Sequence, residues 1–245
     1  MNQNWLILGA SSAMARGFAQ AVSEQGARVF LAGRDKDDLT RSAADCVLRG
    51  AAEAEFLAFD TRKPAGFQAI YDRLALADGV LNVAVFVGTM PEQSAVDADP
   101  DLIDGTATDC FTGPARFLHG FAPMIEARGA GTVVGVGSVA GDRGRISNYV
   151  YGAAKAGFAT YLSGLRNRLN RSGGHVVTVK PGFVDTAMTW GLPGLFLVAS
   201  PQDVARDILK AVDKKKNVIY TPFFWRYIML IIKHVPEAIF KKMSF

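Results

Sequence analysis

A tyrosine and a lysine four residues apart carry the most suggestive chemistry in the sequence. Tyr151 and Lys155 lie in the segment "SNYVYGAAK", within a run whose spacing predicts a helix, and residues four apart project from one helix face. A lysine charge beside a phenol favours the phenolate and lowers its pKa from the usual value of about 10. A tyrosine tuned in this way can donate or accept a proton near neutral pH. The alternative is a solvated helix face without a chemical role.

Other polar residues are expected near this pair because they follow predicted strands. Ser138 comes directly after the apolar run "GTVVGVG". The ends of two more predicted strands carry Asp60 and Thr61, and Lys180, Pro181 and Gly182. Ligands bind at the carboxyl ends of the strands in open α/β sheets. A hydroxyl from Ser138 would there bond the oxygen that Tyr151 protonates and stabilise its developing charge.

A turn of small residues follows the first predicted strand and has features of a phosphate-binding loop. The segment "GASSAMARG" starts at Gly9 and opens a predicted helix, whose first N–H groups can hold phosphate. Alanines, Ala13 and Ala15, stand where a dinucleotide-binding turn has its later glycines. The methyl group of Ala13 is expected to push phosphates outward, and hydroxyls of Ser11 and Ser12 can compensate. The alternative is a plain turn in which a serine caps the helix.

The residue after the second predicted strand bears on the choice of cofactor. The apolar run "ARVFLAG" is followed by Arg34 and then Asp35. An acidic residue at this place would bond a ribose 2′-hydroxyl, whereas an arginine can meet a 2′-phosphate. Arg34 therefore favours NADP(H) over NAD(H). The alternative is that Arg34 pairs with Asp37 or Asp38 on the surface.

Alternating apolar and amphipathic segments predict the elements that position these residues. Strands are expected at residues 4–8, 27–33, 54–59, 79–88, 131–138, 175–181 and 217–221. Helices are expected at residues 14–26, 35–50, 67–76, 100–128, 149–169 and 201–213. Continuous apolar strands separated by helices indicate a parallel sheet covered on both faces. We therefore expect an α/β fold, a Rossmann-type doubly wound parallel sheet of about seven strands, in a single domain over residues 1–245.

Composition and charge exclude several classes of protein. The 245 residues are 49% hydrophobic and 20% charged, with a net charge of +4, which is a globular profile. Basic residues gather near the C-terminus, so we expect a local basic surface rather than a nucleic-acid partner. Cys46 and Cys110 lack metal-binding spacing, so we expect no metal and two reduced core thiols in a cytoplasmic chain. Neither a signal peptide nor a membrane-spanning run is expected.

Taken together, the motifs resemble the short-chain dehydrogenase/reductase family. The segments "GASSAMA", "GSVAG", "YGAAK" and "PGFVDT" carry the resemblance, which extends to about residue 215. It implies a catalytic trio in which Tyr151 is the general acid/base, Lys155 lowers its pKa and holds the nicotinamide ribose, and Ser138 orients the substrate oxygen. It also implies that Thr186 contacts the carboxamide and Asp60 the adenine. The cofactor-binding residues implied are Gly9, Ser11, Ser12, Ala13, Met14, Arg34, Asp60, Thr61, Gly88, Tyr151, Lys155, Pro181, Gly182, Val184 and Thr186.

The chain also departs from the family pattern. Besides Ala13, an Asn-Ala-Gly element after the fourth strand reads "VFVGT" and leaves only Gly88. The family's proton-relay asparagine falls on Cys110, so a backbone group or solvent would have to supply the proton. These departures favour a nucleotide-binding regulatory or scaffold protein without catalysis, and the intact catalytic trio opposes it.

The C-terminal segment carries a closer resemblance within the family. The stretch "SVAGDRGRISNYVYGAAKAG" and the ending "TPFFWRYIMLIIKHVPEAIFKKMSF" look like those of decaprenylphosphoryl-2-keto-ribose reductases, which reduce a keto-sugar on a polyprenyl phosphate. We therefore expect hydride transfer to or from an apolar or lipid-linked substrate, with a soluble hydrophobic ketone as the alternative. Aromatic, aliphatic and basic residues of 222–245 suit a membrane interface, here at the cytoplasmic face. A lid over the cleft or a contact in a homo-oligomer, either dimer or tetramer, is the alternative role.

Overall fold

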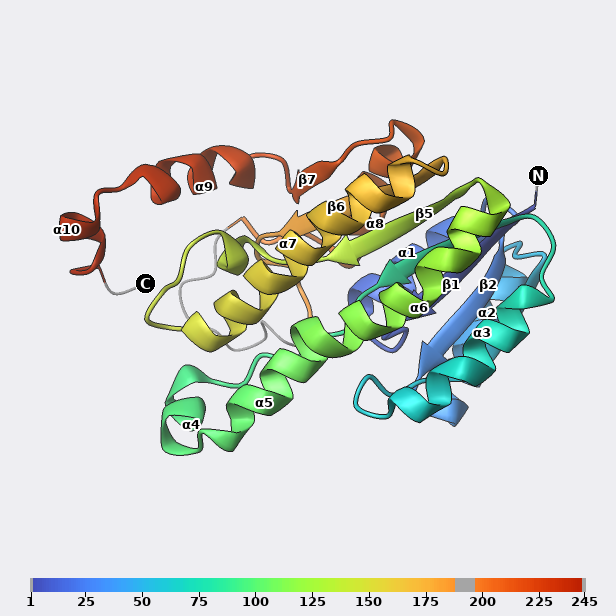
Figure 1. The fold of residues 1–245 in the computed structure, drawn as a ribbon, viewed down its shortest axis with the longest axis horizontal. Coiled ribbons are helices and arrows are strands. Elements are labelled where there is room, and N and C mark those ends of the chain that lie inside the picture. Colours follow the sequence, from blue (N-terminus) through green and yellow to red (C-terminus); the bar gives the residue numbers. More distant parts are fainter. Residues whose placement is uncertain (1, 188–196, 244–245) are drawn as a thin grey trace.

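A single parallel sheet runs through the described part of the chain, residues 2–187 and 197–243 of a computed structural model (Figure 1). Its strands are β1 (Gln3–Leu8), β2 (Arg28–Gly33), β3 (Glu53–Ala58), β4 (Val80–Val85), β5 (Gly131–Val136), β6 (Gly174–Pro181) and β7 (Val218–Thr221). Their order in space is β3-β2-β1-β4-β5-β6-β7, and every neighbouring pair is parallel. The order reverses between β1 and β4, which places a ligand crevice beyond the carboxyl ends of these strands. The predicted doubly wound α/β sheet is confirmed.

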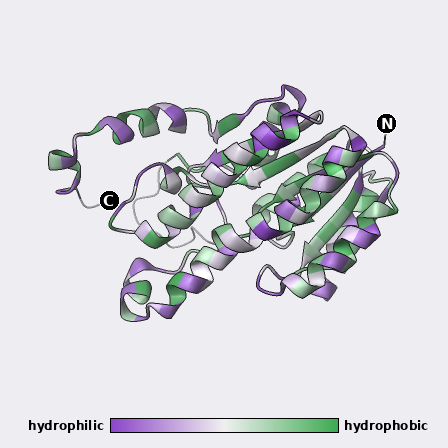
Figure 2. Cartoon of the chain, in the orientation of Figure 1, coloured by the Kyte–Doolittle hydropathy of each residue, from purple (hydrophilic) through white to green (hydrophobic). Residues whose placement is uncertain are grey.

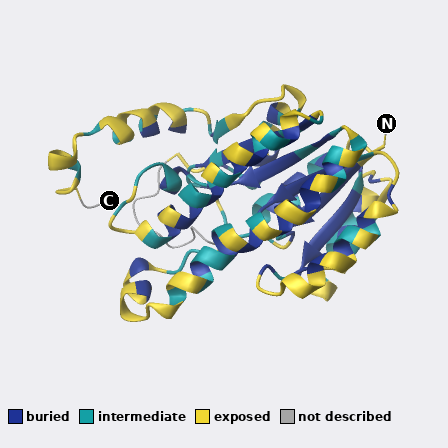
Figure 3. Cartoon of the chain, in the orientation of Figure 1, coloured by how far each residue is buried: buried dark blue, intermediate teal, exposed yellow. Residues whose placement is uncertain are grey.

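Helices cover both faces of the sheet. One face carries α1 (Ala13–Ser23), α2 (Lys36–Leu48) and α8 (Pro201–Asp213), and the other carries α3 (Phe67–Ala75), α6 (Gly113–Arg128) and α7 (Tyr149–Asn170). The strands are therefore buried between two helical layers (Figure 3), which explains why they read as continuous apolar runs. Cys46 and Cys110 are both buried and free, as predicted.

Shorter elements lie beyond the carboxyl edge of the sheet. They are α4 (Gln93–Ala98), α5 (Asp101–Ala107), α9 (Trp225–His234), α10 (Glu237–Phe240), the 3₁₀ turns η1 (Pro64–Gly66) and η3 (Val139–Asp142), and the π turn η2 (Thr108–Thr112). The helix expected over 100–128 is α5, η2 and α6 in succession, while α4 falls in a segment with no predicted helix. In the described part of the chain, no helix combines the length and apolarity needed to cross a bilayer.

The last two helices extend from β7 as an arm along the carboxyl edge of the sheet (Figure 1). Along α9 an apolar run over residues 228–232 is flanked by an arginine and a lysine (Figure 2). The buried face of α9 carries Trp225 and Met229, which pack against Val139 of η3. The arm is thus attached to the loop that follows β5. Residues 244–245 of the expected extension lie outside the described residues.

Candidate active site

The turn between β1 and α1 fits so closely against β4 that its first residue has no room for a side chain. Gly9 has a φ of +75°, and a Cβ there would lie 3.1 Å from backbone atoms of Phe86 and Val87. Ser12 caps α1, because its hydroxyl accepts a hydrogen bond from the N–H of Ala15 at 3.3 Å. Capping of α1 uses only the acceptor capacity of the Ser12 hydroxyl. The same hydroxyl can still donate its proton to a phosphate, so capping and phosphate binding are compatible.

The alanines of this turn have different surroundings. Ala15 is fully buried, whereas Ala13 and Met14 are partly exposed at the start of α1. The close helix packing expected of a glycine comes two residues later, since a Cβ on Gly17 would lie 3.1 Å from the carbonyl oxygen of Pro201 at the start of α8. Gly17 therefore provides the close helix packing that the third glycine of such a turn would provide, although Ala15 stands at that position.

A cleft opens beyond the ends of β1, β2, β3 and β4, where the strand order of the sheet reverses. Its walls include Gly9, Ser11, Ser12, Arg34, Asp60, Thr61 and Gly88 from the predicted cofactor contacts. Arg34 is exposed and has no ion pair within residues 2–187 and 197–243. Asp38 instead pairs with Arg16 at 2.5 Å, so the surface pairing considered for Arg34 is not present.

An ion pair that the sequence did not reveal forms another wall of this cleft. The buried carboxylate of Asp109 accepts hydrogen bonds from Arg62 Nε at 2.9 Å and Nη2 at 2.7 Å. The hydroxyl of Thr89 donates to the same carboxylate at 3.2 Å. The sequence carried no clear signal for this pair, because Asp109 lies in a stretch that contains other aspartates and several threonines.

The catalytic trio comes together at the end of β5. Tyr151 and Lys155 are buried on one face of α7, and the ammonium of Lys155 lies 5.8 Å from the centre of the Tyr151 ring. Lys155 donates to the carbonyl oxygens of Val136 at 3.0 Å and Val87 at 3.3 Å. The Ser138 side chain lies close enough to the Tyr151 hydroxyl to lower its pKa. The trio predicted from two separate motifs is thus brought together at one place.

Burial dominates the electrostatics of this group. It raises the pKa of the Tyr151 phenol, and Cys110 raises that pKa further, while the Ser138 side chain and the charge of Arg145 lower it. Burial also lowers the pKa of Lys155. The expectation that lysine would bring the phenol pKa down is therefore not met in this state. A protonated phenol at neutral pH suits donation of a proton to a substrate oxygen.

The absence of a side chain at Gly88 leaves space for the ammonium group of Lys155. A Cβ on Gly88 would lie 3.0 Å from Lys155 Nζ and 3.4 Å from the sulfur of Cys110. The Cys110 thiol lies in the π turn η2 and donates to the carbonyl oxygen of Thr89 at 3.1 Å. Burial raises the pKa of this thiol. Cys110 is therefore a neutral thiol at neutral pH, and its proton is engaged in the hydrogen bond to the Thr89 carbonyl oxygen.

The motif after β6 lies against the C-terminal arm. A Cβ on Gly182 would overlap the Trp225 indole, and the Phe183 ring meets that indole edge-on with centroids 5.4 Å apart. Val184 is buried and bridges to Ala199. Pro181 ends β6 in a buried position and Thr186 follows in a partly exposed one. Of the predicted nicotinamide-side contacts, Gly182 is thus packed directly against α9.

Comparison with known proteins gives concordant results. The family model of the short chain dehydrogenases matches residues 3–193. An uncharacterized oxidoreductase of Mycobacterium tuberculosis is 29% identical over 219 residues, covering 89% of this chain and 88% of that protein.

Solved structures share the fold. A short-chain dehydrogenase from Sphingobium yanoikuyae in complex with NADPH superposes with a TM-score of 0.81 at 24% identity, covering 97% of this chain and 98% of that one. A 3-oxoacyl-[acyl-carrier protein] reductase with bound NAD from Brucella melitensis gives a TM-score of 0.77 at 22% identity, covering 89% and 88%.

Proposed function

The chain belongs to the short-chain dehydrogenase family of oxidoreductases, and we propose that it is an NADP(H)-dependent reductase of a carbonyl group on an apolar, lipid-linked molecule. The observation that supports the reaction is the assembly of Ser138, Tyr151 and Lys155 at the carboxyl edge of the sheet. We further propose that residues 1–245 form one such domain and that it works as a homo-oligomer, a dimer or tetramer, on the cytoplasmic side.

The proposed roles follow from the geometry of the trio. The bound nicotinamide supplies or accepts the hydride at the carbon atom. In reduction, Tyr151 gives its phenolic proton to the carbonyl oxygen, and Ser138 hydrogen-bonds the same oxygen. Lys155 is fixed by two backbone carbonyls, with its third N–H left for the ribose of the cofactor. In the reverse direction the Tyr151 phenolate takes the proton from the alcohol.

The preference for NADP(H) rests on Arg34. Its exposed guanidinium stands at the cleft without a carboxylate partner in the described residues, where it would meet a 2′-phosphate. A hydrogen bond to a charged group contributes about 1.5–3 kcal/mol. Arg34→Asp should therefore weaken NADPH roughly 10- to 100-fold and leave NADH nearly unchanged in calorimetric titration. Arg171→Asp, at an exposed arginine at the far end of α7, is the control. Equal losses for both cofactors would contradict the proposal.

The substrate proposed is a keto-sugar carried on a polyprenyl phosphate, with a soluble hydrophobic ketone as the alternative. Beside Tyr151 the wall of the site is apolar, with contributions from Met90, Phe111 and Ala140. An inactive nucleotide-binding protein is the remaining alternative. It predicts NADPH binding without NADPH oxidation on any ketone, whereas the reductase proposal requires NADPH oxidation that depends on Tyr151.

We propose that α9 docks on an anionic membrane surface and so brings the site to a lipid-linked substrate. Much of the α9 ribbon is exposed (Figure 3). The exposed apolar side chains are Tyr227, Leu230 and Ile231 of α9 and Phe223 just before it, and the basic residues Arg226 and Lys233 lie in the same helix. Such a helix gains from apolar burial and from about 1 kcal/mol per basic residue near anionic lipid. These contributions support reversible docking.

Vesicle co-sedimentation tests this docking. The intact protein should sediment with vesicles containing phosphatidylglycerol, and less so at high salt. A Leu230→Glu and Ile231→Glu double variant should lose sedimentation, as should truncation after Thr221 provided that it still folds and binds NADPH. Leu48→Glu, at an exposed leucine of α2, should keep it. Absence of sedimentation, with α9 buried between subunits instead, would leave the soluble ketone as the better substrate.

A further inference from the structure

The loop between Ser138 and Tyr151 contains one arginine whose side chain has no hydrogen-bond or ion-pair partner among the described residues. Its other charged side chains are engaged. Asp142 accepts hydrogen bonds from Lys180 and from the Tyr220 hydroxyl. Arg143 donates to the carbonyl oxygens of Ile232 and Val235, each at 2.6 Å. These contacts bind the loop to β6, β7 and the arm.

Arg145 differs from its neighbours. Its Nε is buried and has no hydrogen-bond partner, and no carboxylate within residues 2–187 and 197–243 pairs with its guanidinium. Buried polar groups of folded proteins are nearly always hydrogen-bonded, so an unpaired one calls for an explanation such as an absent ligand. Arg145 lies close enough to Tyr151 for its charge to lower the pKa of that phenol. The free cation therefore belongs to the loop that leads into Tyr151 and acts on its phenol through its charge.

Asn148 provides a second unpaired atom in the same turn. The turn is closed by a hydrogen bond from the N–H of Asn148 to the carbonyl oxygen of Arg145 at 3.1 Å. Asn148 is the first residue before α7, yet its side chain does not cap that helix. Its Oδ1 is buried without a hydrogen-bond partner. An asparagine in this position ordinarily caps, so its side chain is directed elsewhere.

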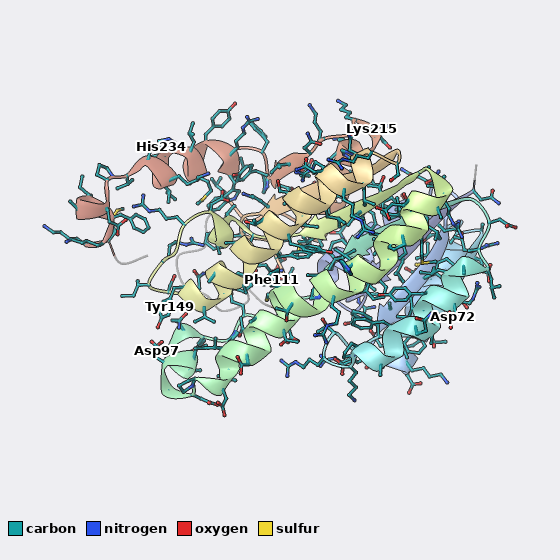
Figure 4. The ribbon with its side chains drawn as sticks, in the orientation of Figure 1. Asp72, Asp97, Phe111, Tyr149, Lys215 and His234 are labelled. Carbon is teal, nitrogen blue, oxygen red and sulfur yellow. The ribbon has the colours of Figure 1, made fainter. Side chains whose placement is uncertain are left out.

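The carboxylate on the neighbouring helix is already engaged. Asp97 of α4 accepts a hydrogen bond from the hydroxyl of Tyr149 at 2.5 Å and another from Gln93 at 3.0 Å. Tyr149 and Asp97 face one another across α7 and α4 in Figure 4. Gln93 Oε1 in turn accepts from the N–H of Val150. The Asp97 carboxylate is thus committed to partners other than Arg145.

We propose that Arg145 binds an anionic oxygen group of the substrate, a phosphate ester or a carboxylate, next to the carbonyl that is reduced, with Asn148 accepting from a neighbouring hydroxyl. A guanidinium forms paired, charge-assisted hydrogen bonds to either anion. The proposal rests on the reductase function, and it narrows the substrate to an apolar molecule with an anion near its carbonyl. Neutral ketones would leave the arginine unpaired and are disfavoured on that ground.

Three matched ligands test this proposal on full-length protein saturated with NADP⁺: geranyl phosphate, geranic acid and geraniol. They share one apolar chain and differ in the end group, and calorimetry gives each Kd. At least one anion should bind wild-type protein 10-fold or more tightly than geraniol. Arg145→Gln should remove that advantage and leave the Kd of geraniol unchanged. The stronger of the two anions identifies the phosphate or the carboxylate.

Two variants guard against indirect effects. Asn148→Asp places a carboxylate in the turn with almost no change in shape, and it should also suppress anion binding. Arg171→Gln removes an exposed arginine at the far end of α7 and should leave the anion advantage intact. Equal binding of all three ligands, or an advantage that survives Arg145→Gln, would overturn the proposal. Failure of NADP⁺ to bind would contradict the cofactor proposal, and the titrations repeated without cofactor would still report on Arg145.

Discussion

The two halves of the site are held by different means. The cofactor half, at the ends of β1, β2 and β4, depends mainly on close packing at glycines. A Cβ on Gly9 would meet backbone and one on Gly88 would meet Lys155 Nζ, and the Arg62–Asp109 ion pair adds one wall. The substrate half is held by side chains that join segments far apart in the chain, as when Arg143 reaches Ile232, 89 positions away. Close packing at a glycine can be recognised in a short sequence motif, whereas a side-chain contact between distant segments has no local sequence signal.

The contrast explains what could be predicted from the sequence. Every strand was expected, because buried parallel strands are apolar throughout. The trio was predicted from spacing, since Tyr151 and Lys155 share a helix face and Ser138 ends a strand. The seat of Trp225 against Gly182 and the pair of Asp109 with Arg62 were not predicted, because neither partner's type or spacing indicates the other.

The largest effect is expected where the two halves meet. Tyr151→Phe keeps the ring and removes the proton, so turnover should fall about 10²- to 10⁴-fold. NADPH affinity should change little, because the cofactor half does not depend on this hydroxyl. Steady-state rates and calorimetric titration on one preparation check both statements. Turnover near the wild-type level would assign the proton transfer to another group.

Ser138→Ala should give the next largest effect. Loss of one hydrogen-bond donor to a developing oxyanion lowers turnover by about 10²-fold. The variant also removes the hydroxyl that lowers the pKa of Tyr151, so that pKa should rise. Alcohol oxidation needs the phenolate, and the rising limb of its pH profile should therefore move to higher pH. Ser147→Ala, at an exposed serine of the same loop, should change neither rate nor profile.

Arg143→Gln tests the long-range contacts of the substrate half alone. The side chain bonds two carbonyl oxygens and Glu237 and stacks on the Phe240 ring at 3.6 Å. Loss of a hydrogen bond from a charged group should lower the free energy of unfolding by about 1.5–3 kcal/mol.

Limited proteolysis provides the second measurement for Arg143→Gln. Cleavage within residues 225–240 should become faster while NADPH affinity is retained. The control is Arg226→Gln on the exposed face of the same helix, which should leave cleavage slow. A parallel loss of NADPH affinity in Arg143→Gln would show that the halves are coupled, and the comparison would fail.

The smallest effect is expected in the cofactor half, at Ala13→Gly. If the Ala13 methyl holds phosphates away from the turn, its removal should improve NADPH affinity by a few-fold. The change also costs helix stability, up to about 1 kcal/mol in a helix interior and less in the first turn. Ala21→Gly, further along α1 and partly exposed, measures that cost without touching the turn.

A lower Tm in both variants, with tighter NADPH binding only in Ala13→Gly, would identify the methyl as an obstruction. Unchanged affinity would show instead that the turn accommodates alanine, with Gly17 already providing the close approach of α1 to α8. If Ala13→Gly instead binds NADPH more weakly than the wild type, the methyl group stabilises the binding conformation of the turn. The obstruction hypothesis would then be wrong.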